Sequence, residues 1–346
     1  MDRQDKDLGF LLRYENVAWY ENGRVRILDR RIYPVGVEFV VCESYVDVAA
    51  AIGDMVTQSG GPPTAAGMGM ALAAYEGRDL GERDFLAHME GAAYALAHAR
   101  PTTAANMAVI TARSLGVAKA ALEAGESGAA IADLIFEDVI DRLNAHYARY
   151  ESIGRHLCGL IPKNGIVMTQ CYGETVLGML LRADRARGGG LRFICPETRP
   201  YYQGARLTAS LIHDMGYDAT VITDNMPAHI MARRGVDIFT SAADIICMDG
   251  HIINKIGTFQ IALAAKYHEI PYFATGTPNR HHPTISTTHI EERDPALVLE
   301  SMGRPHTLPG VKGYYPAFDT TPPALCAGIV TDKGVFQTNE LDKYYS

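Results

Sequence analysis

The first part of the chain shows two successive patterns of apolar and polar residues. Residues 13–42 alternate between the two kinds, and Asn22-Gly23 separates two alternating runs, which is a strong signal for a β-hairpin. From residue 46 to about residue 150 the sequence is rich in alanine, and its apolar residues recur at helical spacing. We therefore predict a small β element followed by a helical domain within residues 1–150.

The second part alternates short apolar runs with amphipathic helices. The apolar runs are Ile166–Thr169, Leu191–Cys195, Ala219–Ile222, Val236–Thr240 and Pro271–Ala274. The predicted helices between them are Glu174–Ala186, Arg206–Met215, Pro227–Arg234 and Ile256–Tyr267. Apolar strands separated by helices are typical of a parallel sheet that is covered on both faces. We predict a doubly wound, Rossmann-like α/β domain for residues 151–346, in which the apolar stretch Ile245–Met248 and the polar stretch Asn279–Pro309 have no assigned structure.

Composition and charge narrow the class of protein. The 346 residues (37.7 kDa) are 47% hydrophobic and 21% charged, as in globular proteins, which excludes disordered, collagen-like and coiled-coil chains. A formal net charge of −8 without a run of basic residues argues against binding to nucleic acid or to an anionic membrane. Six cysteines without a C-x-x-C pair, together with a charged N-terminus, indicate a reduced, cytoplasmic setting.

Chemistry is expected where the predicted strands end, because ligands of open α/β sheets bind beyond the carboxyl ends of the strands. Cys171 follows the first strand and precedes a helix whose positive end would stabilise a thiolate, so it is a candidate nucleophile or acid/base. Asp244 follows the fourth strand and precedes apolar residues, a setting that suits a general acid. Asn254-Lys255 precede a helix, where an ammonium and free backbone N–H groups would bind an anion. The alternatives are a small buried hydrophobe for Cys171, a turn residue for Asp244 and a solvated side chain for Lys255.

Three residues of the helical domain are candidate phosphate ligands. Gly60-Gly61 would let backbone amides approach a phosphate before a helix, and Arg100 would bind it through its guanidinium; a plain turn is the alternative for the glycines. The chain has neither a G-x-x-x-x-G-K-[ST] motif nor a strand followed by G-x-G-x-x-G, and its 12 histidines lack metal-binding spacing. The residues alone therefore indicate an α/β enzyme that acts on a small compound, which could be phosphorylated. They imply no metal and no cofactor.

One segment resembles the signature of a known family. Residues 197–209 read ETRPYYQGARLTA and are similar to the ETRP-x-x-QGARLTA motif of methylthioribose-1-phosphate isomerases. That family is related to ribose-1,5-bisphosphate isomerases and to the regulatory subunits of the translation-initiation guanine-nucleotide exchange factor. Further matching segments are Ile27–Asp29, Arg100–Thr102, Ile222–Met226 with His229, Asn254–Thr258, Ile290–Pro295, Pro316–Asp319 and Thr321–Pro322. The resemblance covers nearly the whole chain.

The resemblance implies an aldose–ketose isomerase that converts a pentose 1-phosphate into the ketose 1-phosphate. The substrate would be methylthioribose 1-phosphate or a related 5-substituted or deoxy sugar 1-phosphate. Cys171 and Asp244 match the family's catalytic cysteine and aspartate. The family's substrate-binding positions correspond to Gly60, Gly61, Arg100, Gln203, Asn254 and Lys255. Because relatives assemble as dimers or larger rings, the resemblance also implies a homodimer, with a sugar phosphate as ligand and no metal or redox cofactor.

Several positions depart from the family pattern. Ser59 stands where methylthioribose-1-phosphate isomerases carry an arginine before the glycine pair, so a charge-assisted contact to phosphate is lost. After Cys171, the residues Tyr172 and Val176-Leu177 resemble the non-catalytic regulatory subunits, and Ile245 stands in place of another arginine. These departures predict a divergent substrate. The alternative is a non-catalytic regulatory or sugar-phosphate-sensing protein on the same scaffold.

Overall fold

The structure is a computed structural model of the chain, which describes residues 3–100, 104–301 and 303–346. It divides into two compact units, Met1–Ala148 and Arg149–Ser346, and each is described by itself. Within the described ranges, no helix combines the length and the apolar character that crossing a bilayer requires.

In the first unit, two 3₁₀ turns, η1 (Phe10–Leu12) and η2 (Tyr14–Asn16), precede a three-stranded antiparallel sheet in the order β1-β2-β3. Its strands are β1 (Ala18–Glu21), β2 (Arg24–Leu28) and β3 (Phe39–Cys42). Asn22 and Gly23 connect β1 to β2 with positive φ angles of 51° and 71°, as a tight two-residue hairpin requires. The predicted hairpin and small β element are confirmed.

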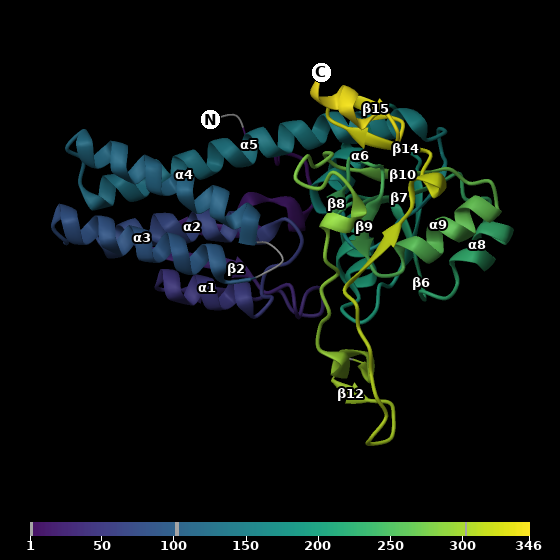
Figure 1. Cartoon of the computed structure of the whole chain (residues 1–346), viewed down its shortest axis with the longest axis horizontal. Coiled ribbons are helices and arrows are strands. Elements are labelled where there is room, and N and C mark those ends of the chain that lie inside the picture. Colours follow the sequence, from purple (N-terminus) through teal and green to yellow (C-terminus); the bar gives the residue numbers. More distant parts are fainter. Residues whose placement is uncertain (1–2, 101–103, 302) are drawn as a thin grey trace. The chain divides into compact units, whose positions relative to one another are not determined.

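Helices form the rest of the first unit (Figure 1). They are α1 (Tyr45–Gly53), α2 (Gly61–Glu76), α3 (Glu82–His98), α4 (Ala104–Glu123) and α5 (Gly128–Leu160), the last of which continues into the second unit. Helix α2 is buried along most of its length, as its alanine, glycine and methionine content predicts. A Cβ at Gly67 would lie 2.8 Å from Val139, so glycine lets α2 and α5 approach closely.

The second unit is built on a seven-stranded sheet in the order β15-β14-β10-β7-β4-β5-β6. The strands are β4 (Ile166–Met168), β5 (Arg192–Pro196), β6 (Asp218–Ile222), β7 (Ile238–Ala242), β10 (Tyr272–Thr275), β14 (Gly328–Thr331) and β15 (Gly334–Phe336). Every neighbouring pair is parallel except β14 with β15. Strand order therefore reverses between β4 and β7, as in doubly wound folds, and the predicted fold class is confirmed.

The helices of this unit largely agree with the pattern of the sequence. They are α6 (Glu174–Ala186), α7 (Ser210–Asp214), α8 (Pro227–Arg234) and α9 (Thr258–Tyr267). The bounds of α6 and α8 are those predicted. The predicted helix Arg206–Met215 instead begins with a π-helical turn, η4 (Gly204–Ala209), and continues as α7.

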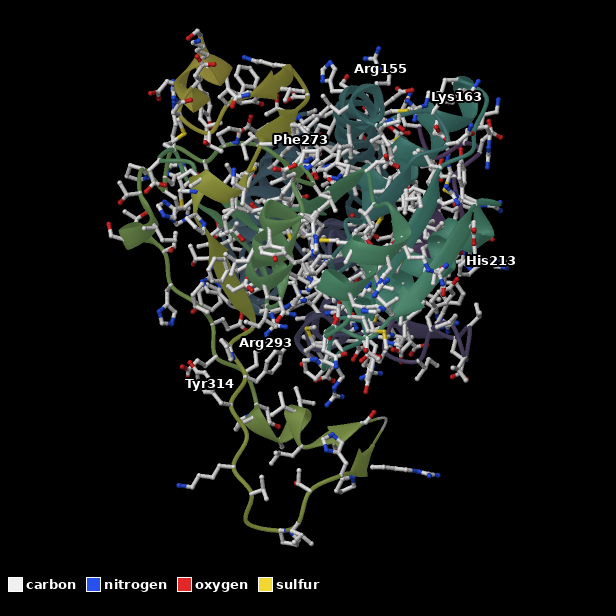
Figure 2. The ribbon with its side chains drawn as sticks, turned by 90° about the vertical axis from the view of Figure 1, so that its right-hand side faces the viewer. Arg155, Lys163, His213, Phe273, Arg293 and Tyr314 are labelled. Carbon is white, nitrogen blue, oxygen red and sulfur yellow. The ribbon has the colours of Figure 1, made fainter. Side chains whose placement is uncertain are left out.

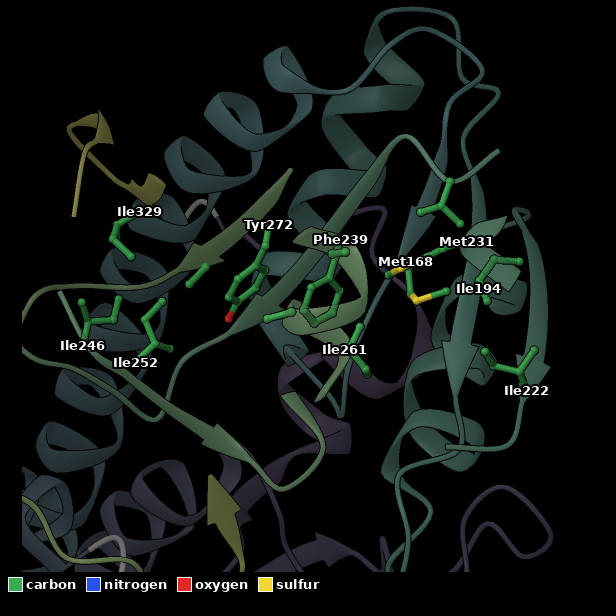
Figure 3. Packing of buried hydrophobic residues seen from close by; sticks show 14 of the residues in the cluster. Met168, Ile194, Ile222, Met231, Phe239, Ile246, Ile252, Ile261, Tyr272 and Ile329 are labelled. Carbon is green, nitrogen blue, oxygen red and sulfur yellow. The ribbon is translucent and has the colours of Figure 1, made fainter. Parts of the chain in front are cut away.

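The core of the sheet is formed by apolar side chains from neighbouring strands and from α9 (Figure 3). Phe239 of β7 and Tyr272 of β10 are both buried and stack with ring centres 4.5 Å apart. Met168, on the other side of β7, extends the same cluster toward β5. This packing fixes the ends of β4 and β7 relative to each other, which is what positions the candidate site.

Besides β14 and β15, two parts of the second unit were not predicted. A small antiparallel sheet consists of β8 (Ile245–Ile246), β9 (Ile252–Lys255) and β13 (Phe318–Thr321), so the unassigned apolar stretch after residue 244 begins as a strand. Residues 291–317, here called the arm, extend away from the body of the unit (Figures 1 and 2). The arm contains η6 (Pro295–Val298), β11 (Glu300–Ser301) and β12 (Arg304–Pro305), which account for part of the unassigned polar stretch.

Candidate active site

The candidate site lies where strand order reverses in the second unit. Strands β4 and β7 are parallel neighbours, so the residues that follow them share one edge of the sheet. A small cavity at this edge is lined by residues that follow β4, by the last residues of β7 and by a residue of η4. Its lining includes Gln170, Cys171, Thr208, Ser241 and Ala242. The structure thus places Cys171 at the switch point, as strand-end reasoning predicted.

Cys171 is held by two threonines from the segment between β5 and α7. Its backbone is left-handed (φ 58°), a conformation uncommon for a residue other than glycine. The N–H of Cys171 donates to Thr198 Oγ1 at 3.2 Å, and its carbonyl accepts a hydrogen bond from Thr208 Oγ1. These contacts satisfy both backbone polar groups and fix the direction of the thiol.

The surroundings of Cys171 favour the protonated thiol. Burial raises the pKa of Cys171 to about 11, and the charge of Asp244 acts in the same direction. Lys255 and Arg293 oppose this effect and lower the pKa of the thiol. The expectation that the start of α6 would stabilise a thiolate is therefore wrong for the unliganded protein, because desolvation outweighs the favourable charges. At neutral pH the group is therefore a protonated thiol in the unliganded protein.

Asp244 lies close enough to Cys171 to interact with it electrostatically. Its N–H donates to the carbonyl of Ile253 at 2.9 Å, which links the end of β7 to β9. The residue is exposed, so the apolar surroundings expected around its carboxylate are absent from the described structure. The apolar residues that follow Asp244 pack elsewhere, because Ile245 and Ile246 form β8 and Ile246 is buried in the core of the sheet.

Asn254 and Lys255 are the last residues of β9, and both are buried. Asn254 Nδ2 donates to Thr258 Oγ1 at 3.0 Å. The Lys255 ammonium lies 4.4 Å from the ring centre of Phe318, close enough for a cation–π interaction. A buried cation beside the thiol is a strong point of attraction for an anionic substrate.

Asp319 was missed by the sequence analysis as a site residue and changes the interpretation of this helix start. Its carboxylate accepts hydrogen bonds from the N–H groups of Gly257 (2.7 Å) and Phe259 (3.2 Å) at the N-terminus of α9. The anion site predicted from free N–H groups is therefore wrong in part, because the chain's own carboxylate occupies them. Lys255 remains the candidate anion ligand here. Asp319 follows Lys255 by 64 positions, so no local spacing could have paired them.

Burial raises the pKa of Asp319 to about 6, against the lowering effect of the Gly257 and Phe259 N–H groups and of Lys255. The folded protein thus holds this proton more tightly than the unfolded chain, whose aspartate has a pKa of 3.8. The stabilising contribution of Asp319 is present below about pH 4 and is lost as the pH rises through about 6.

We expect the Asp319→Asn variant to lose this pH dependence, because the amide does not titrate. As the pH rises from about 4 to about 7, the free energy of unfolding of the variant should increase by about 1–3 kcal/mol relative to that of the wild type. Urea unfolding followed by far-UV circular dichroism at several pH values measures the difference. A difference that is constant across this range would contradict the assignment.

Gln203 lies just before the π-helical turn η4, and 7% of its surface is exposed. Its Oε1 is buried without a hydrogen-bond partner among the described residues, which suits a residue that binds a ligand hydroxyl. Gly204 is required next to it, because a Cβ there would lie 1.8 Å from the carbonyl oxygen of Pro196. Asp224 holds the preceding loop by accepting the N–H groups of Thr198 (2.8 Å) and Arg199 (2.7 Å).

The remaining candidates belong to the first unit. Gly60 precedes α2 and Gly61 is its first residue, while Arg100 is half-buried beyond α3; Thr102, its neighbour in the matching segment, lies outside the described residues. A Cβ at Gly61 would lie 1.9 Å from Thr57 Oγ1, so close packing requires glycine here whether or not the backbone amide binds a phosphate.

Arg30 is a buried cation that the sequence analysis did not single out. Its Nη1 donates to the carbonyl of Gln58, and it lies 3.5 Å from the position of a Cβ on Gly61. The resemblance had pointed to the preceding segment, Ile27–Asp29, which was the available signal.

The chain belongs to the Initiation factor 2 subunit family, whose pattern it matches over residues 61–338. Among curated relatives, methylthioribose-1-phosphate isomerase of Chloroflexus aurantiacus is 36% identical and covers 92% of this chain and 94% of its own length. The protein of the same name from Pelotomaculum thermopropionicum is 33% identical and covers 93% and 90%. The family resemblance seen in the sequence is confirmed, and the chain stands among isomerases.

Solved structures agree with this placement. The 5-methylthioribose 1-phosphate isomerase of Pyrococcus horikoshii matches 95% of this chain and 94% of its own, with 29% identity and a TM-score of 0.83. The translation initiation factor eIF-2B subunit delta from A. fulgidus matches 92% and 95%, with 29% identity and a TM-score of 0.81. Enzymes and initiation-factor subunits therefore share this fold, and the site residues must distinguish them.

Proposed function

We propose that the protein is an aldose–ketose isomerase that converts a pentose 1-phosphate, methylthioribose 1-phosphate or a related 5-substituted or deoxy sugar 1-phosphate, into the ketose 1-phosphate. The observation that carries the proposal is the presence of Cys171 and Asp244 together at the switch point of the sheet. Relatives with isomerase names over nine-tenths of the chain support it.

A phosphate on the anomeric carbon prevents simple ring opening, so the enzyme must protonate the ring oxygen as the bond from this oxygen to the first carbon breaks. Hydrogen then moves from the second carbon to the first, and the hydroxyl of the second carbon becomes a carbonyl. The proton lost from that hydroxyl balances the one given to the ring oxygen. The product is an isomer with its phosphate still on the first carbon.

Asp244 acts as the general acid/base for the two oxygens in this scheme. Its exposed carboxylate can exchange protons with bulk water between turnovers. Cys171 assists the hydrogen transfer between the two carbons, as a thiol that is protonated in the unliganded protein. No step requires a metal or redox cofactor.

The remaining candidates bind the substrate. Gly60, Gly61, Arg100 and Lys255 hold the phosphate through N–H groups and positive charge. Gln203 and Asn254 contact the sugar hydroxyls, and the unpartnered Oε1 of Gln203 supports this role. Ser59 in place of an arginine makes the phosphate site less positive. The proposal therefore includes related sugar 1-phosphates besides methylthioribose 1-phosphate.

The proposal is tested by proton and phosphorus NMR of the purified protein with methylthioribose 1-phosphate, 5-deoxyribose 1-phosphate and ribose 1,5-bisphosphate. We expect a ketose phosphate to appear with at least one member of this panel. Boiled protein and the Asp244→Asn variant are the controls. Binding of these sugars without conversion of any would reject the proposed activity on them.

A second candidate function is regulatory, or sugar-phosphate sensing without turnover. It is favoured by Tyr172 and Val176-Leu177, which resemble the regulatory subunits, and by Ser59. The similarity to a structure named as an eIF-2B subunit is compatible with it. It predicts that calorimetry will detect sugar-phosphate binding while NMR detects no product.

We further propose a cytoplasmic homodimer. All six cysteines are free in the described structure, which suits a reducing compartment. Size-exclusion chromatography with light scattering should give twice the chain mass of 37.7 kDa. A monomer across the micromolar range would remove the dimer from the proposal.

A further inference from the structure

The loop that supports Cys171 has an unfavourable backbone. Residues 198–203, here called the signature loop, include Thr198 (φ 63°) and Tyr202 (φ 56°), both left-handed without being glycine. Such a conformation is most unfavourable for a β-branched residue such as threonine. It persists only where the surrounding structure imposes it. The loop therefore depends on contacts from outside itself.

The arm supplies contacts to one side of this loop. Arg199 Nη2 donates to the carbonyl of Glu300 at 2.8 Å and to that of Val298 at 3.4 Å. Both acceptors are backbone groups of the arm, at η6 and β11, so they require the arm's local fold and not a particular side chain. Asp224 holds the opposite side of the loop through the N–H groups of Thr198 and Arg199.

Tyr202 joins the same contact. Arg199 Nη1 donates to its hydroxyl at 2.8 Å, and the guanidinium lies 5.1 Å from its ring centre. The Tyr202 hydroxyl is also hydrogen-bonded to Ser301 Oγ of β11. One arginine thus connects the two left-handed parts of the loop to the arm by polar contacts with defined geometry.

The root of the arm is fixed beside Cys171. The outgoing and returning segments of the arm are joined here by two backbone hydrogen bonds. The N–H of Arg293 donates to the Tyr315 carbonyl (2.9 Å), and the N–H of Ala317 donates to the Glu291 carbonyl (2.8 Å). Arg293 and Tyr315 interact electrostatically with Cys171, and Tyr315 is buried. Figure 2 shows Arg293 and Tyr314 where the arm leaves the body of the unit. A displacement of the arm would therefore be felt at both the loop and the thiol.

We propose that the arm is a positioning element of the active site and that Arg199 is the residue through which it acts. By clamping the signature loop against β11, it holds Thr198 on the backbone of Cys171 and keeps Gln203 aimed at the substrate. The catalytic part of this inference rests on the proposed isomerase function, whereas the mechanical part does not.

The test compares Arg199→Ala with Arg304→Ala, a matched control that removes an exposed arginine from the same arm. We expect Arg199→Ala to increase amide hydrogen exchange of residues 198–203 at least tenfold. Alkylation of the Cys171 peptide by iodoacetamide should become faster, and its pH profile between about pH 7 and pH 10 should move to lower pH, because water reaches the thiol. Arg304→Ala should leave both measurements unchanged.

Steady-state kinetics separate positioning from simple instability. A smaller folded fraction lowers the apparent kcat alone, whereas a misplaced Gln203 also raises KM, which we expect to increase at least fivefold in Arg199→Ala. Arg199→Lys keeps one charged donor and should recover part of the loss. Ser301→Ala is a milder second variant for the case that Arg199→Ala does not fold.

The outcomes for the arm and for the enzyme are distinguishable. Wild-type hydrogen exchange and alkylation in both Arg199→Ala and Ser301→Ala would overturn the clamp, whether or not the protein turns over a sugar. Failure of the wild type to convert any sugar phosphate would reject the proposed function, and the exchange and alkylation results would still decide the role of the arm.

Discussion

Replacing Cys171 with serine is expected to reduce kcat by about 10²–10⁴-fold while substrate binding persists. A serine hydroxyl occupies nearly the same space but is a far weaker acid and nucleophile than a thiol. The contacts of Thr198 and Thr208 are to the backbone of residue 171, so the substitution leaves them in place. The loss should therefore appear in the chemical step, with KM changed little.

The measurement is the initial rate of ketose phosphate formation by NMR, with binding followed by calorimetry. Cys326→Ser is the matched control, because Cys326 donates to the carbonyl of Gly328 at 3.2 Å, a contact that a hydroxyl can reproduce. We expect wild-type rates from this control. Wild-type rates from Cys171→Ser as well would show that the thiol takes no part in catalysis.

Replacing Asp244 with asparagine is expected to lower kcat by about 10²–10⁴-fold, because the amide can neither give a proton to the ring oxygen nor take one from the hydroxyl. Asp244 is exposed, so its loss should change the stability of the fold little. The same substitution should also change the reactivity of Cys171 in a defined direction. The negative charge of Asp244 raises the pKa of Cys171, so removing it should speed alkylation of Cys171 at mildly alkaline pH.

Turnover and alkylation of Cys171 test the role of Asp244 separately, and the alkylation measurement needs no substrate. Asp218→Asn is the control, since Asp218 is also exposed but lies at the start of β6, away from the switch point. Unchanged turnover in Asp244→Asn would remove the general acid/base from the proposal. Unchanged thiol reactivity would show that the carboxylate does not act on Cys171.

The parallel sheet could be predicted because its strands are short apolar runs separated by helices with clear limits. Helix α6 begins after Gly173 and α8 begins at Pro227 and is followed by Gly235, and these residues mark helix ends in any context. Strands β13 and β14 and the arm have no such signals. The two strands have four residues each and pair with β9 and β10, which are distant in sequence, and the arm is mixed in polarity.

The candidate site shows the same division. Cys171 and Asp244 were identifiable because each directly follows a predicted strand, and the ends of parallel strands meet. Asp319 could not be identified, because its role depends on the antiparallel pairing of β13 with β9. The exposure of Asp244 and the high pKa of Cys171 were also beyond the sequence, since both depend on how much water the folded structure excludes.

The close approach at Gly204 limits how this protein can vary. Any side chain there would collide with the end of β5, and the π-helical turn that follows Gln203 would have to move away from the strand. A library randomised at residues 198–204 should therefore return only glycine at position 204, whichever sugar is used for selection. Changes in substrate preference would have to come from other positions, with the backbone beside Gln203 left as it is.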